Sequence, residues 1–209
     1  MKAKSIVMGV LLLFGVVTLL GSCKIIDTGE VGVKTTFGQI DQQEVNPGFT
    51  LKAPFITSLR SYNVKEATIQ LRDLTPKAGD NLSLEDMDVS IYYEVNGDTV
   101  AELLSEFSGQ TLYDDEEGVW MPGRGIAIRL AREAVYDTIS QMDSLTIHKQ
   151  RALIATNIKE RLQAELNGVA PGSFVITKVV VRAITTDQSI EAAIQAAVNS
   201  QKELEQKQV

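Results

Sequence analysis

Hydrophobic and polar residues alternate over several short stretches of the chain, and this period of two predicts β-strands. Residues 31–37 form the first such stretch, and residues 62–71 are expected to hold one or two more strands. Asn46-Pro47-Gly48 predicts a turn, because proline fixes φ and glycine adopts a positive φ; an extended segment resumes at Phe49. The clearest strand places five residues on one face: Met87, Val89, Ile91, Tyr93 and Val95.

From residue 99 onward the spacing of hydrophobic residues changes to that of α-helices. Thr99 and Glu102 have the spacing of a capping box, which predicts a helix start. Residues 109–123 predict an irregular acidic segment, and residues 124–136 a helix. A longer helix is expected over 147–167, with Gly168 just past its end and an apolar row of Ile154, Ile158, Leu162 and Leu166.

The last predicted elements are a strand over residues 174–184 and a helix over 189–209. Strands followed by helices, one strand and a final helix predict an α+β fold, in which helices cover one side of a mostly antiparallel sheet. The final helix has a heptad seam of under three repeats, which is marginal as a coiled coil alone. It either associates with other copies or packs on its own domain; its predicted oligomerisation residues are Ile190, Ile194, Ala197 and Leu204.

The N-terminus has the pattern of an export signal. Lys2 and Lys4 precede residues 5–23, which carry no charge and are mostly aliphatic. Leu20-Gly21-Ser22-Cys23 resembles the lipobox of bacterial lipoproteins, in which the cysteine is lipidated and becomes the mature N-terminus. The alternatives are an uncleaved anchor helix, since a span needs about 20 apolar residues, and a buried cytoplasmic helix. Either form of anchor places the residues after 24 outside the cytoplasm.

Composition excludes several classes of site. The 209 residues carry a net charge of −7 without a cluster of lysine and arginine, so nucleic acid is not an expected partner. One histidine and one cysteine do not supply the ligands of a zinc site, and a single cysteine forms no disulfide within the chain. No cofactor is expected.

No catalytic constellation stands out, so we expect no enzymatic activity. His148 is predicted at a helix start, where a surface or capping role is the common one. Residues 118–124 have the glycine spacing of a P-loop but carry Arg124 in place of the lysine. The acidic run 114–117 suits a weak divalent cation or, more simply, a solvated loop, since it lacks the ligand spacing of a calcium loop.

Residues 27–198 contain several short motifs in succession, among them Gly29-Glu30-Val31-Gly32-Val33, Asn46-Pro47-Gly48-Phe49, Lys52-Ala53-Pro54-Phe55-Ile56 and Asp86-Met87-Asp88-Val89. Their order and spacing resemble the SPFH (band 7, prohibitin/stomatin) family. The resemblance implies a non-enzymatic membrane scaffold that assembles laterally, organises membrane microdomains and, in several members, regulates membrane proteases of the AAA type. The expected partners are membrane lipid, further copies or related SPFH subunits, and such a protease.

The resulting division of the chain is a signal or anchor over residues 1–23, an SPFH domain over 27–188 and a short helix, a truncated coiled coil, over 189–209. Cys23 is the predicted lipidation site. As the resemblance implies, the predicted membrane-contact residues are Phe49, Leu51, Phe55 and Ile56, although an ordinary core role for them is the alternative. The expected function is a membrane-anchored, prohibitin-like scaffold on the periplasmic side; the alternative is a monomeric lipoprotein that binds one envelope partner.

Overall fold

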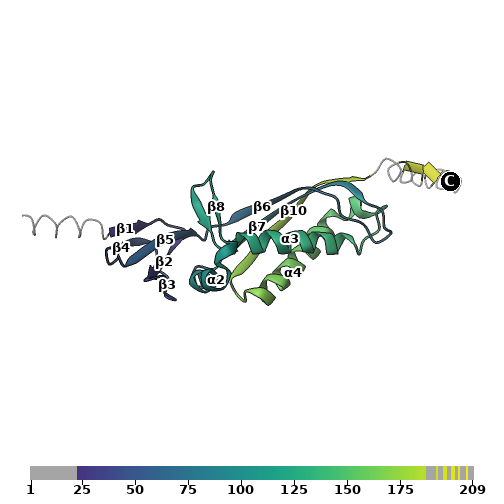
Figure 1. Ribbon diagram of the computed structural model, residues 1–209. Coiled ribbons are helices and arrows are strands. Elements are labelled where there is room, and N and C mark those ends of the chain that lie inside the picture. Colours follow the sequence, from purple (N-terminus) through teal and green to yellow (C-terminus); the bar gives the residue numbers. More distant parts are fainter. Residues whose placement is uncertain are drawn as a thin grey trace, which may run out of the picture. The chain divides into compact units, whose positions relative to one another are not determined.

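The computed structural model describes residues 23–186 and isolated helical positions between 192 and 206. This part of the chain forms two compact units (Figure 1). The first contains residues up to Lys65 together with Val95–Gly125, and the second contains Glu66–Glu94 and the residues from Ile126 onward. Most of the described residues lie within the predicted SPFH domain, residues 27–188, whereas β1 precedes its predicted start.

The first unit is built from short antiparallel strands. Strand β2 is the middle of a three-stranded sheet in the order β3-β2-β5, and β1 pairs with β4 in a separate two-stranded ribbon. Gly32 of β2 permits close packing, because a Cβ there would lie 2.3 Å from Cδ1 of Ile26. The strands are β1 (Cys23–Ile26), β2 (Glu30–Thr36), β3 (Gln39–Ile40), β4 (Gly48–Leu51) and β5 (Thr57–Asn63).

One local prediction in the first unit is confirmed in part and another is wrong. Thr99 is the N-cap residue of α2 (Val100–Phe107), as predicted, but its side chain makes no capping hydrogen bond; η1 (Gly97–Thr99) precedes α2, and the Asn96 side chain that caps η1 accepts from the backbone N–H of Asp98. Residues 109–123, predicted to be irregular, form η2 (Ser108–Gln110) at their start and then a hairpin of β8 (Leu112–Asp114) and β9 (Val119–Met121). Three-residue strands are too short for a period of two to reveal them.

The second unit is a sheet covered by helices, as the predicted α+β fold requires. Strand β7 (Leu84–Val95) lies between β6 (Ala67–Leu74) and β10 (Phe174–Thr186). Helices α3 (Arg124–Ile139) and α4 (Arg151–Val169) lie along one side of the sheet, and η3 (Ile147–Lys149) precedes α4 (Figure 1). The predicted apolar row of α4 is confirmed as core, since all four residues are buried: Ile154, Ile158, Leu162 and Leu166.

Helix α4 also satisfies the backbone of β10. The Gln163 amide donates to the carbonyl oxygen of Phe174 and accepts from the N–H of Ile176, both at 2.8 Å, as a neighbouring strand would. The prediction that Gly168 follows the helix end is wrong. The backbone N–H of Ala170 still bonds to the carbonyl oxygen of Leu166, so the helix continues to Val169.

A polar contact fastens two loops of the second unit. The Asp80 carboxylate accepts from the N–H of Ser144 at 3.3 Å and from its hydroxyl at 2.5 Å, and Ser144 is fully buried. The Ser144 hydroxyl bond lowers the pKa of Asp80, because it favours the ionised carboxylate. Nearby, the N–H of Gly79 bonds to the carbonyl oxygen of Met142, so both loops are held at the backbone as well.

Candidate functional site

The ribbon of β1 and β4 presents one apolar face to solvent. Its register pairs Cys23 with Leu51 and Ile25 with Phe49. Paired residues share a face, and so do residues two apart along a strand, so these four side chains lie on the same face. All four are exposed, whereas Ile26, which points the other way, is buried.

A second exposed apolar group lies where β2 ends and β5 begins. The predicted strand through Phe37 ends one residue early: β2 stops at Thr36, and Phe37 takes a left-handed φ of 52°. Phe55, in the loop before β5, also has a left-handed φ, of 67°. The backbone N–H of Phe37 donates to the carbonyl oxygen of Ile56 at 3.1 Å, which joins the turn to the loop.

We call these residues together the apolar tip, and they share high exposure: Ile25, Phe37, Phe49, Leu51, Phe55 and Ile56. Phe55 is 92% exposed and Phe37 81%. Single exposed apolar residues are normal, but a group of six within one small unit marks an interaction surface. All four predicted membrane-contact residues belong to the tip, so the ordinary core role considered for them is not what the structure shows. Their contact with lipid stays a prediction.

Sequence reasoning missed Ile25 and Phe37 of the tip. Ile25 lies in a four-residue strand, which is too short for a clear alternation. Phe37 continued an alternating pattern in which Val31 and Val33 are buried, and Gly38, with a φ of 85°, was the available turn signal. The predicted oligomerisation residues lie outside the described residues: Ile190, Ile194, Ala197 and Leu204.

Two basic side chains of the first unit are engaged within the protein. Lys24 donates to the carbonyl oxygen of Leu59 at 3.1 Å, and the Arg60 guanidinium lies 4.8 Å from the Trp120 ring centroid. Burial of the phenol raises the pKa of Tyr62. The nearby Arg60 guanidinium lowers this pKa, but by less than burial raises it. Within residues 23–186, Lys52 forms no ion pair with a carboxylate.

The other residues singled out from the sequence form no visible catalytic arrangement. The acidic run is the turn of the β8–β9 hairpin, where the Asp114 carboxylate accepts from the N–H groups of Glu116 and Glu117 and pairs with Arg124 at 3.7 Å. Residues 119–121 are a paired strand, so the glycine-rich segment does not wrap around a phosphate. His148 lies in η3, with its Nδ1 buried and without a hydrogen-bond partner.

Two kinds of feature are absent from the described part of the chain. Its His, Cys, Asp and Glu side chains form no group of three or more that could hold a metal ion. None of its helices combines the length and the hydrophobicity that crossing a bilayer requires.

The fold and the tip together define a mixed α+β protein whose first unit bears a group of exposed apolar side chains. The chain belongs to the SPFH domain / Band 7 family, whose sequence model matches residues 24–209. Proteins of this family are generally associated with membranes, and membership is consistent with a scaffold role. A search of the curated proteins finds no match for this chain.

Proposed function

We propose that this protein is a membrane-anchored scaffold of the SPFH type. It binds a bilayer through its N-terminal end, associates laterally with further copies or related subunits, and organises or regulates membrane proteins, a membrane protease of the AAA type among them. It carries out no bond-breaking chemistry. Its mechanism is avidity, because many weak lateral contacts and many anchors act together on one surface.

One observation supports the proposal: in the β1–β4 register, Cys23 shares a face with Ile25, Phe49 and Leu51 of the apolar tip. Cys23 is paired with Leu51, so an acyl chain on its sulfur would leave from the face that bears Ile25 and Phe49. Anchor and tip would then enter the same bilayer leaflet. An N-terminal membrane helix ending at Cys23 would bring the same face to the membrane. The proposed compartment is the periplasmic side of a bacterial membrane, as the lipobox-like sequence indicates.

The mass of the mature N-terminus distinguishes a lipid anchor from an uncleaved anchor helix. We expect mass spectrometry of the protein isolated from membranes to show cleavage before Cys23 and a mass increase for two or three acyl chains on that residue. Two or more chains give stable anchoring, whereas one gives weak, reversible binding. An intact N-terminus beginning at Met1 would instead support the anchor helix, and a Cys23→Ser variant that stays on membranes would agree with it.

The size of the protein in mild detergent tests whether it assembles as a scaffold does. We expect the full chain to elute as a large assembly, and an Ala197→Cys variant in a Cys23→Ser background to form dimers under oxidation. As a control, Lys202→Cys, which moves the thiol off the predicted seam, should cross-link less. A monomer of about 20 kDa that does not cross-link at Ala197 would contradict the scaffold and support the alternative, a monomeric lipoprotein that binds one envelope partner.

A further inference from the structure

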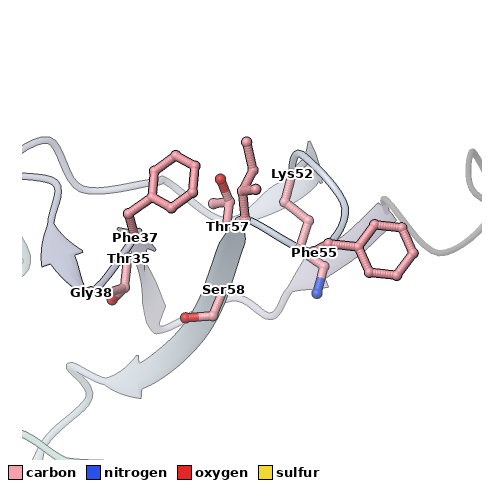
Figure 2. Close-up of a pocket in the computed structure, with 8 residues that line it drawn as sticks. Thr35, Phe37, Gly38, Lys52, Phe55, Thr57 and Ser58 are labelled. Atoms are coloured by element: carbon pink, nitrogen blue, oxygen red, sulfur yellow. The ribbon is translucent and has the colours of Figure 1, made fainter.

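An open pocket of about 530 Å³ lies beside the apolar tip, within the first unit. Phe37, Phe55 and Ile56 supply its apolar lining. In Figure 2 the rings of Phe37 and Phe55 extend on opposite sides of the strand that carries Thr57 and Ser58.

The polar side chains of the lining carry hydroxyl or ammonium groups. Thr35, Thr57 and Ser58 contribute hydroxyl groups, and Lys52 contributes an ammonium group. Thr35 is paired with Ser58 in the β2–β5 register, so these two side chains share a face, whereas Thr57 lies on the other face and its hydroxyl is hydrogen-bonded with that of Thr36 at 3.3 Å. Lys52, Thr35 and Ser58 are hydrogen-bond donors, and no carboxylate lines the pocket. Such a lining suits an anion that accepts several hydrogen bonds.

Charge around the pocket runs against the charge of the whole protein. Residues 45–65 contain Lys52, Arg60 and Lys65 and no aspartate or glutamate, in a chain with a net charge of −7. Lys52 is half-buried and without a carboxylate partner among residues 23–186, so its ammonium group is available to an external anion.

The backbone holds both phenylalanines in costly conformations. A left-handed φ is unfavourable in a bulky residue and persists only where the surrounding structure fixes it. The bonds from Phe37 N–H to Ile56 and from Thr57 N–H to Ala53 fix these two segments. Strain that keeps two large apolar rings exposed points to a binding role, since it contributes nothing to the core.

We propose that this pocket binds the phosphate group of an anionic phospholipid, with Lys52 and the hydroxyls of Thr35 and Ser58 as donors and with Phe37 and Phe55 lying among the neighbouring acyl chains. This inference rests on the proposed membrane function and names the lipid class for which the tip is selective. The pocket is lined by both donor and apolar groups, and a phospholipid at a membrane surface presents phosphate and hydrocarbon side by side.

The test uses the full chain in a neutral, non-ionic detergent, mixed with equal amounts of phosphatidylglycerol and phosphatidylcholine. Native mass spectrometry then measures the ratio of the two lipids retained by each protein. We expect the wild type to prefer phosphatidylglycerol by roughly fivefold, as one lysine at a membrane surface provides. Lys52→Gln should bring the ratio close to one, and Lys52→Arg should restore it. Lys65→Gln removes the same charge outside the pocket and should leave the ratio unchanged.

Each result either supports or overturns the proposed lipid headgroup site. An equal ratio in the wild type, or equal effects of Lys52→Gln and Lys65→Gln, would overturn the headgroup site while leaving the scaffold untouched, because assembly size and vesicle binding are measured separately. If millimolar inorganic phosphate displaced phosphatidylglycerol completely, the pocket would be a site for free phosphate and the lipid assignment would be wrong. Retention that resists phosphate and depends on Lys52 would support it.

Discussion

Replacing Phe55 and Ile56 with serine is expected to weaken vesicle binding by roughly 30- to 1,000-fold. The estimate takes about 2–4 kcal/mol for moving these two side chains from water into the bilayer, with Ile56 counted in part because it is already partly covered. Phe55 is 92% exposed and Ile56 43%, so the folded protein gives up little packing when they are replaced. Sedimentation with vesicles of phosphatidylcholine and phosphatidylglycerol measures the change.

The protein for this experiment is residues 23–209 with Cys23→Ser, so that the predicted anchor does not mask the tip. The fragment keeps β1, which begins at residue 23, and every residue of the two described units. The matched control replaces Leu153 and Val175, each 51% exposed in the second unit, with serine. It should pellet like the parent. If tip and control variants pelleted equally, with folding verified by circular dichroism, the apolar tip would not be a membrane-binding surface.

Leu162→Ala is expected to lower the free energy of unfolding by about 2–5 kcal/mol, the usual range for a fully buried leucine. Leu162 is 0% exposed and lies in the row of α4 that packs against the sheet. The loss combines the transfer free energy of the deleted methyl groups with the cavity that they leave. Urea unfolding followed by far-ultraviolet circular dichroism gives the change in midpoint.

Helix α4 supplies its own control. Leu153→Ala makes the same substitution on the same helix, at a residue that is 51% exposed. Surface substitutions of this kind change stability by about 0.5 kcal/mol or less. Two equal shifts would mean that the described packing of α4 is wrong, since helix propensity changes by the same amount in both variants.

The parts of the fold that followed from sequence are those with long periodic patterns. The twelve-residue strand β7 and the nineteen-residue helix α4 repeat their pattern often enough to fix both the element and its buried face. The hairpin β8–β9 and the cap at Asn96 depend on contacts of one or two residues, which no period records. The resemblance to the SPFH family, now confirmed over residues 24–209, supplied four of the six tip residues.

Phe37 shows what a local pattern leaves undecided. The alternating pattern places Phe37 on the same face as Val31 and Val33, which are buried. That placement holds only if the extended strand continues through Phe37. The left-handed turn at Phe37 breaks the alternation and sends the ring outward. Its partner in the turn is the Ile56 carbonyl, nineteen residues away, so the cause of the exposure is not local in sequence.

The sequence by itself determined the α+β class, the apolar N-terminal segment, the buried row of α4 and the family. Only the tertiary structure decided that Cys23, Ile25, Phe49 and Leu51 share one open face and that Lys52 joins two exposed phenylalanines around a pocket. The physical reason is that alternation divides a strand into two faces but does not say which face another layer covers. The pairing of β1 with β4 and the packing of Ile26 into the core decide that, and they leave the other face of the ribbon exposed.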